Sequence, residues 1–132
     1  MTPSGSTLRR AILVAVCCSG CAALSEDLQR GEEAFEQASY EEALVWFADL
    51  DDDVPRMDTD MQARFYYLRG MTSYRLGQRD DALHYLAICR EVTGDDARLL
   101  RPEWAQNVTR TLDELTPDSR SFRARAAPAA TP

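Results

Sequence analysis

Two stretches of this 132-residue chain carry the same pattern of small and aromatic residues, 39 positions apart. The pairs at this offset are Gly31 and Gly70, Phe35 and Tyr74, Ala38 and Gly77, Ala43 and Ala82, and Phe47 and Leu86. A glycine inside a helix costs about 1 kcal/mol relative to alanine, so two equivalent glycines indicate close contact with another helix. The repeat therefore predicts two similar units, residues 28–50 and 67–89.

Each unit is predicted to contain two helices joined by a tight turn. Glu26 and Asp27 favour the opening turn of the first helix, because acidic side chains suit the positive end of the helix dipole. Ser39 and Glu42 have the spacing of a capping box, which predicts the start of the second helix. Pro55 then ends the first unit.

The second unit has its own start and stop signals. Thr59 and Gln62 form another capping-box pattern, and they predict a third helix that reaches Leu76. Gly77 suits the left-handed turn after that helix. The fourth helix is expected to stop near Gly94.

A fifth helix is predicted to begin at Pro102, which suits the first helical turn, and to end at Pro117. Its apolar face consists of Trp104, Val108, Leu112 and Leu115. It would cap the second unit, with Trp104 buried against it. The expected fold class is therefore all-α, a short α-α solenoid of two helix pairs plus a C-terminal capping helix over residues 25–116. Residues 117–132 lack a periodic apolar face and are predicted to be disordered.

Residues 24–94 resemble the tetratricopeptide repeat family, in which small residues let paired helices pack closely. The matching positions are Gly31, Phe35, Ala38, Tyr40, Ala43, Phe47 and Pro55 in the first unit, and Gly70, Tyr74, Gly77, Ala82 and Leu86 in the second. The repeat departs from the family in length, 39 residues against about 34. Asp27 stands at the family's Trp place and Gly94 at its Pro place. An unrelated helical bundle is the alternative.

The resemblance implies that a peptide or protein segment binds the concave face formed by the first helix of each pair. The groove positions are Leu28, Glu32, Phe35 and Glu36 in the first unit and Arg64, Tyr67, Met71, Tyr74 and Arg75 in the second. Tyrosine and arginine are frequent interface hot spots, and methionine adapts to varied partners. The alternative is that several of them, Phe35 and Tyr74 among others, form the core between helices. The family's Asn- and Lys-based clamp for a peptide C-terminus is absent from these positions.

The N-terminal region has the order of features of a secretory signal. Arg9-Arg10 precedes an apolar run over residues 11–18, and Ser19-Gly20-Cys21 follows. The run is shorter than the about 20 residues that a membrane-spanning helix needs. This order resembles the signal and lipobox of bacterial lipoproteins, with Cys18 where leucine is usual. An ordinary signal cut elsewhere, or a buried core segment, is the alternative.

The lipoprotein resemblance implies that residues 1–20 are removed and that Cys21 carries the lipid. Two or three acyl chains would anchor the chain stably, because one chain binds a bilayer only marginally. Residues 21–24 would form a short tether. Ala22 replaces the aspartate that retains many such proteins in the inner membrane, so the expected location is the periplasmic face of the outer membrane.

Charge and cysteine content exclude several classes of function. The chain has 15 arginines, no lysine and 22 acids, and removal of Arg9 and Arg10 would leave 13 arginines against 22 acids, a net charge of −9. Such acidity disfavours nucleic acid and anionic lipid as partners. Cys89 would be the one unmodified thiol of the mature chain, which allows no intramolecular disulfide. It is predicted to be a core residue.

No catalytic, cofactor or metal site is predicted. His84 is the single histidine, and no glycine-rich phosphate loop occurs. Residues 51–53 with Asp58 and Asp60 are acidic, but Val54-Pro55 interrupts them and they lack the central glycine and late glutamate of an EF-hand loop. The expected function is therefore a non-enzymatic, membrane-anchored adaptor that binds another envelope protein through the groove. The alternative is a structural or regulatory subunit that self-associates through its helices.

Overall fold

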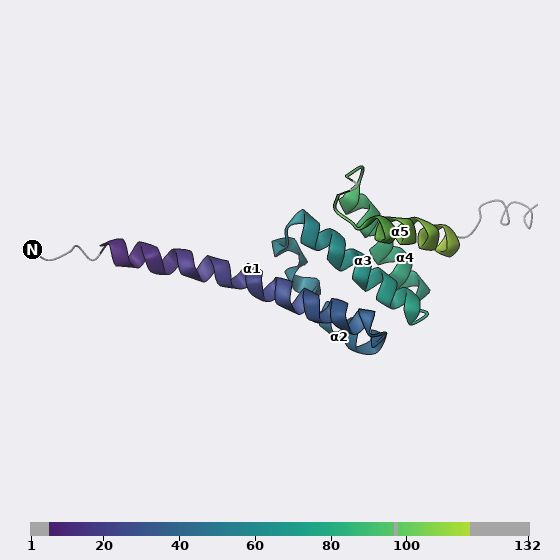
Figure 1. Cartoon of the computed structure of the whole chain (residues 1–132), viewed down its shortest axis with the longest axis horizontal. Helices are drawn as coiled ribbons and strands as arrows, with labels where there is room; N and C mark the ends of the chain where they lie inside the picture. Colours follow the sequence, from purple (N-terminus) through teal and green to yellow (C-terminus); the bar gives the residue numbers. More distant parts are fainter. Residues whose placement is uncertain (1–5, 97, 117–132) are drawn as a thin grey trace, which may run out of the picture.

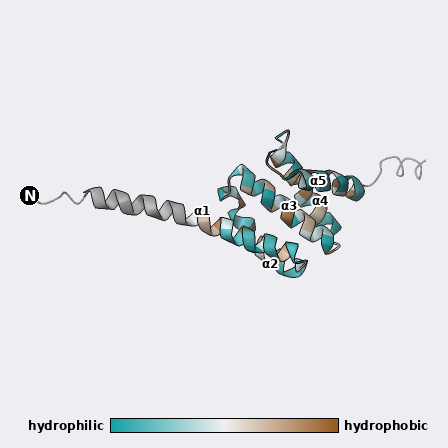
Figure 2. Cartoon of the chain, viewed as in Figure 1, coloured by the Kyte–Doolittle hydropathy of each residue, from teal (hydrophilic) through white to brown (hydrophobic). Residues whose placement is uncertain are grey.

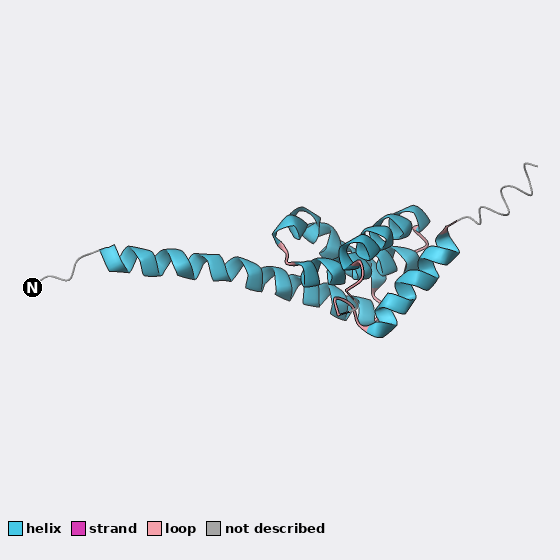
Figure 3. Ribbon diagram, turned by 90° about the horizontal axis from the view of Figure 1, so that it is seen from above, coloured by secondary structure: helices cyan, strands magenta, loops and turns pink. Residues whose placement is uncertain are grey.

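The computed structural model describes residues 6–96 and 98–116, and their side chains at Gly20, 22–96 and 98–116. Its elements are α1 (Ser6–Glu36), α2 (Tyr40–Leu50), the short 3-10 helix η1 (Asp51–Arg56), α3 (Thr59–Arg75), α4 (Arg79–Thr93) and α5 (Pro102–Leu115). The described residues contain helices, turns and bends and no strand (Figure 3). The all-α fold class predicted from the sequence is confirmed.

The helices pack in sequential order around α3. Helix α1 lies along α2, α3 lies along α4, and α3 also contacts α1 and α2. Helix α5 packs against α4 (Figure 1). The N-terminal half of α1 projects away from the other helices in both Figure 1 and Figure 3. Helix α3 therefore has neighbours on both sides, whereas α1 contacts the other helices only through its C-terminal half.

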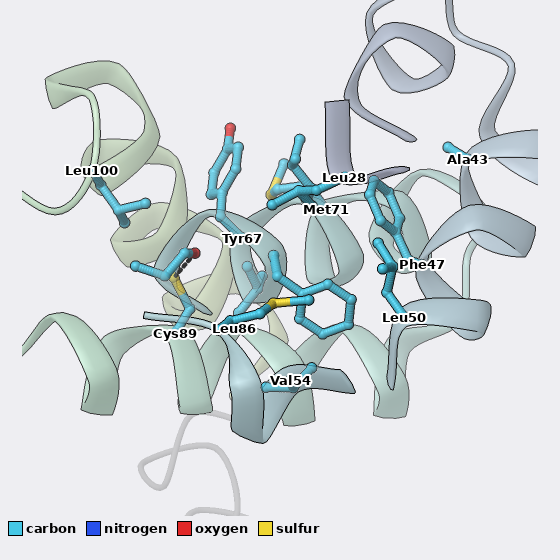
Figure 4. Close-up of a cluster of buried hydrophobic side chains, with 14 of the residues drawn as sticks. Leu28, Ala43, Phe47, Leu50, Val54, Tyr67, Met71, Leu86, Cys89 and Leu100 are labelled. Carbon is cyan, nitrogen blue, oxygen red and sulfur yellow. Dashed lines mark hydrogen bonds between the residues drawn. The ribbon is translucent and has the colours of Figure 1, made fainter. Parts of the chain in front are cut away.

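The core lies between the helix pairs and under α5. Hydrophobic and hydrophilic stretches alternate along α3, α4 and α5, as amphipathic packing requires (Figure 2). The largest fully buried hydrophobic side chains are Phe47, Phe65, Leu28, Leu68 and Leu86. Figure 4 shows how Leu28, Phe47 and Leu86 contribute to one cluster from α1, α2 and α4.

The repeated glycines make the close helix contacts that the sequence predicts. A Cβ added at Gly31 would lie 2.9 Å from Cζ of Phe47, and a Cβ added at Gly70 would lie 2.7 Å from Cγ of Leu86. Phe47 and Leu86 are themselves 39 positions apart. The two helix pairs therefore use the same kind of contact, a glycine facing a large side chain of the second helix.

The turns within the two pairs are also equivalent. Gly77 has φ +75°, as expected for the left-handed turn after α3, and Ala38 at the matching position of the first unit has φ +58°. In each turn the next residue returns a backbone bond to the helix: Ser39 N donates to Ala34 O, and Gln78 N donates to Ser73 O, both at 2.9 Å. These bonds satisfy carbonyl groups that the helix end leaves free.

The starts of α1 and α3 differ from the sequence expectations, and α2 starts where expected but without the expected cap bond. Helix α1 begins at Ser6, so Glu26 and Asp27 lie inside it and not in its first turn. Ser39 is the N-cap of α2 but makes no side-chain cap bond. Asp58, not Thr59, caps α3, because its carboxylate accepts a bond from Met61 N at 2.8 Å.

The predicted partner of the third cap has another role. Gln62 Nε2 donates to the main-chain carbonyls of Met57, at 2.9 Å, and Val54, at 3.2 Å. It therefore ties η1 to the start of α3. Pro55, expected to end the first unit, lies within η1.

The last two helices follow the sequence prediction. Helix α4 ends at Thr93 with Gly94 as its C-cap, and Pro102 occupies the first turn of α5. On α5, Val108, Leu112 and Leu115 are buried, and Trp104 is half-buried against the core. The predicted disordered segment, residues 117–132, and the end expected at Pro117 lie outside the described residues.

Candidate functional site

The nine predicted groove residues divide into buried and accessible groups. Leu28, Glu32, Tyr67 and Met71 are at most 5 % exposed. Figure 4 shows Leu28, Tyr67 and Met71 within the buried cluster. Arg64, Phe35 and Tyr74 are half-buried, and Glu36 and Arg75 are exposed. The structure therefore does not present all nine as one open groove, since four of them pack inside the molecule.

Glu32 is buried because two arginines bind its carboxylate. Arg64 Nε of α3 donates to Oε2 at 2.6 Å, and Arg101 Nη2, at the N-cap of α5, donates to Oε1 at 3.0 Å. Charge-assisted bonds to both oxygens compensate the carboxylate for lost water. This cluster joins α1, α3 and the start of α5, so Glu32 and Arg64 hold helices together in this structure.

Helix α5 covers Tyr67 and Met71. The Trp104 ring stacks on Tyr67 with centroids 4.2 Å apart, and Asn107 Nδ2 donates to Tyr67 Oη at 3.1 Å. Burial raises the pKa of the Tyr67 phenol. Thr111 Oγ1 lies 3.9 Å from Met71 Sδ. These contacts cover the middle of the predicted groove on α3, at Tyr67 and Met71.

The four remaining accessible residues lie at the C-terminal ends of α1 and α3. Phe35 and Glu36 are 39 positions before Tyr74 and Arg75, so the two pairs occupy equivalent places in the repeat. Tyr74 Oη donates to Glu114 Oε2 of α5 at 2.8 Å. We call Phe35, Glu36, Tyr74, Arg75 and Glu114 the distal surface.

Local contacts set the properties of this surface. The Phe35 ring meets the Tyr40 ring edge-on, with centroids 5.6 Å apart. The hydrogen bond to Glu114 raises the pKa of the Tyr74 phenol, because ionisation would lose the donated proton and place two negative charges together. The distal surface therefore offers aromatic rings flanked by one arginine and two carboxylates.

The sequence reasoning missed the polar residues of α5 that reach α3. Trp104 was predicted to face the second unit, but Asn107, Thr111 and Glu114 were not assigned contacts. They lie on the same side of α5 as Trp104, at spacings of three and four residues. This helical spacing was the signal that could have identified them.

A second cluster missed by sequence reasoning surrounds Arg69. Its guanidinium lies 4.9 Å from the Tyr85 ring and 3.5 Å from Asp51 Oδ2. Its Nε and Nη1 are buried without a hydrogen-bond partner among the described residues. Burial raises the pKa of the Asp51 carboxyl, while Arg69 and Tyr85 oppose that effect. The cluster links the start of η1 to α3 and α4.

The described residues offer few groups for chemistry. Cys89 is buried and donates to Ala63 O at 3.5 Å (Figure 4), and burial raises its pKa to about 12. The thiol is therefore protonated at neutral pH and is a poor nucleophile. His84 is exposed beside Tyr85. Among the side chains described at 22–96 and 98–116, no three His, Cys, Asp or Glu gather where they could hold a metal ion.

The predicted lipidation site lies within α1. The backbone is helical through Cys21, while the side chain of Cys21 lies outside the described part. Gly20, Ala22 and Ala23 are exposed, and Leu24 is the first buried residue of the described side chains. No helix in the described part has both the length and the hydropathy needed to cross a membrane.

The chain was compared with family models, curated proteins and solved structures, and no match was found in any of the three.

Proposed function

We propose that the protein is a lipid-anchored, non-enzymatic adaptor that binds another protein of the cell envelope. The observation that carries this proposal is the order Ser19-Gly20-Cys21 directly before a helical repeat domain. The lipid on Cys21 would hold the domain at the periplasmic face of the outer membrane. The helical domain would supply the surface for the partner.

We also infer that the helices form two tetratricopeptide-like pairs with α5 as a cap. The equivalent contacts of Gly31 with Phe47 and of Gly70 with Leu86 support this inference. The positive φ values of Ala38 and Gly77 support it at the turns. The proposed partner surface is the distal surface, because four of the nine groove residues are accessible there and its aromatic and arginine side chains suit an interface.

The anchor and the partner surface are tested separately. Cys21→Ser should prevent lipidation and leave the signal attached. The intact mass of the membrane-extracted protein measures both effects. Retention of the same acyl mass in this variant would contradict the anchor.

The partner surface is tested with Arg75→Glu and the matched control Arg79→Glu, since both arginines are exposed and neither forms an ion pair in the described residues. Cross-linking in intact cells followed by mass spectrometry should give one reproducible envelope protein, which Arg75→Glu loses and Arg79→Glu keeps. Equal recovery by both variants would rule out the distal surface. Absence of any reproducible partner would count against the adaptor.

Self-association is a second candidate function, favoured by Val45 on α2. Its side chain is 61 % exposed, and it is the one large hydrophobic residue in the described part that is so exposed. A second copy of the chain could cover it. Sedimentation at micromolar concentration should then show a dimer that Val45→Glu dissociates, whereas a monomer at that concentration would exclude this candidate.

A further inference from the structure

We propose that α1 fixes the orientation of the helical domain at the bilayer, so that the distal surface points away from the lipid. This inference rests on the proposed lipid anchor at Cys21. Beyond the anchor itself, it specifies which end of the molecule faces the membrane and from which side a partner approaches.

Cys21 lies close to the packed core. Leu24 is 8 % exposed and Leu28 is fully buried, so the packed domain begins three residues after Cys21. Even if residues 21–24 were fully extended, they would span only about 10 Å. In the structure they are part of α1, which is helical without a break from Ser6 to Glu36. The tether therefore leaves the domain little freedom to turn over.

The end of the domain where α1 enters also contains η1 and the start of α3. Helix α1 turns back into α2 after Glu36, so η1, which follows α2, returns toward Leu24. Arg64 near the start of α3 binds Glu32 of α1, which holds α3 beside α1. In Figure 1 and Figure 3, η1 and the start of α3 lie on the side from which α1 projects. This end would face the bilayer.

The distal surface lies at the other end of the domain. The turn between α1 and α2, the turn between α3 and α4, and the end of α5 lie on the opposite side of the domain (Figure 1). Fourteen residues of continuous helix separate Cys21 from Phe35, and at 1.5 Å per residue they span about 20 Å. Phe35, Glu36, Tyr74 and Arg75 are therefore the candidate residues farthest from the lipid.

The partner is consequently an envelope protein that presents its contact segment up to about 20 Å beyond the lipid-bearing residue. A protein embedded in the same bilayer must extend a domain or loop that far to reach Phe35, Glu36, Tyr74 and Arg75. Approach along the bilayer surface would instead meet η1 and the start of α3, where the exposed Asp52, Asp58 and Asp60 lie.

Energy transfer from single labels to acceptor lipids tests this orientation. Asp52→Cys places a fluorophore at the end proposed to face the bilayer, and Gln37→Cys places one at the opposite end; both residues are exposed. Buried Cys89, with a pKa of about 12, stays unlabelled. The lipidated chain is reconstituted into phosphatidylcholine vesicles that contain an acceptor-labelled lipid, and flotation with the vesicles is measured in the same samples.

The expected result is at least twofold more transfer from Asp52→Cys than from Gln37→Cys, because the labels should differ by about 20 Å in height. A Gly-Ser linker of about 12 residues inserted after Ala22, with an r.m.s. length of roughly 20 Å, should abolish the difference. Equal transfer from the two sites in a protein that floats would overturn the orientation while leaving the anchor intact. Failure of the unaltered protein to float would overturn the anchor and the orientation together.

Discussion

The two helix pairs share one contact geometry but differ in their surroundings. In each pair a glycine faces a large side chain of the second helix, Gly31 with Phe47 and Gly70 with Leu86. Helix α3 also has α1 and α2 beside it and α5 across it, whereas α1 has an open side. Eight residues of α3 are buried, from Ala63 to Ser73. Position in the stack, and not the repeat pattern, therefore decides how much of a helix is buried.

The comparison is tested most strongly by truncating one fully buried leucine in each pair. Leu68→Ala in α3 should lower the free energy of unfolding by about 4 kcal/mol, and Leu28→Ala in α1 by about 3 kcal/mol. The loss should be larger for Leu68→Ala, because the helices on both sides of α3 prevent the cavity left by the substitution from collapsing. Urea unfolding followed by circular dichroism measures both variants. Equal losses would mean that α1 is held as firmly as α3.

The next largest effect should come from adding a methyl group at the helix contacts. Gly70→Ala should destabilise the protein by about 2 kcal/mol and Gly31→Ala by about 1 kcal/mol, since overpacking outweighs the gain in helix propensity. The Cβ at position 70 would also lie 3.1 Å from the backbone nitrogen of Leu86, whereas at position 31 the nearest atoms belong to the Phe47 ring. Thermal unfolding ranks the two variants.

A double variant distinguishes a steric clash from another cause. Leu86→Ala removes the atoms that the new methyl group would meet, so Gly70→Ala should cost less in that background than in the parent chain. If the two losses simply add, the contact between α3 and α4 does not limit residue size at position 70.

A smaller effect is expected from the ion cluster that joins α1 to α3 and α5. Glu32→Gln should lower the free energy of unfolding by about 1 kcal/mol, because Arg64 and Arg101 can still reach water. Glu36→Gln, one turn later at the exposed C-terminal end of α1, is the matched control and should change little. The measurement is urea unfolding at low and high salt. A loss for Glu36→Gln as large as for Glu32→Gln would show that the cluster does not stabilise the packing.

A change of similar size concerns the thiol in the second pair. Cys89 should react with a thiol reagent at pH 8 only as fast as α4 opens, and urea should accelerate the reaction.

The folded pKa of Cys89, about 12, lies above the ordinary value of 9.0, so stability from this group is present below about pH 9 and is lost as pH rises toward 12. Stability measured at pH 8 and pH 10 should show the fall, and Cys89→Ala should lack it. Rapid labelling of the folded protein would contradict the burial.

Local sequence patterns predicted helix ends well where the signal involves backbone conformation. Gly77, Gly94 and Pro102 each occupy the predicted place, because left-handed φ values and the loss of an N–H donor restrict what surrounds them. The cap patterns were less specific. Asp58 competed with Thr59 for the start of α3, and Gln62 found carbonyls in η1 that its local pattern could not reveal.

The candidate site was only partly predictable for a physical reason. Periodicity and the family resemblance placed Glu32, Tyr67 and Met71 on one face of their helices. Such a face can form either a buried core or an open groove, and the pattern does not distinguish the two. Arg101, Trp104 and Thr111 decide between the two, and they are about 40 or more positions away in sequence. No local pattern carries that information.

The sequence by itself determined the helical class and the close contacts at Gly31 and Gly70. It also predicts lipidation at Cys21. These depend on helix period, on glycine's missing side chain and on local order along the chain. The tertiary structure alone decided that α5 covers Tyr67 and Met71 and leaves Phe35, Glu36, Tyr74 and Arg75 accessible. The burial of these residues depends on which sequence-distant helix packs against them, and that contact exists only in the folded chain.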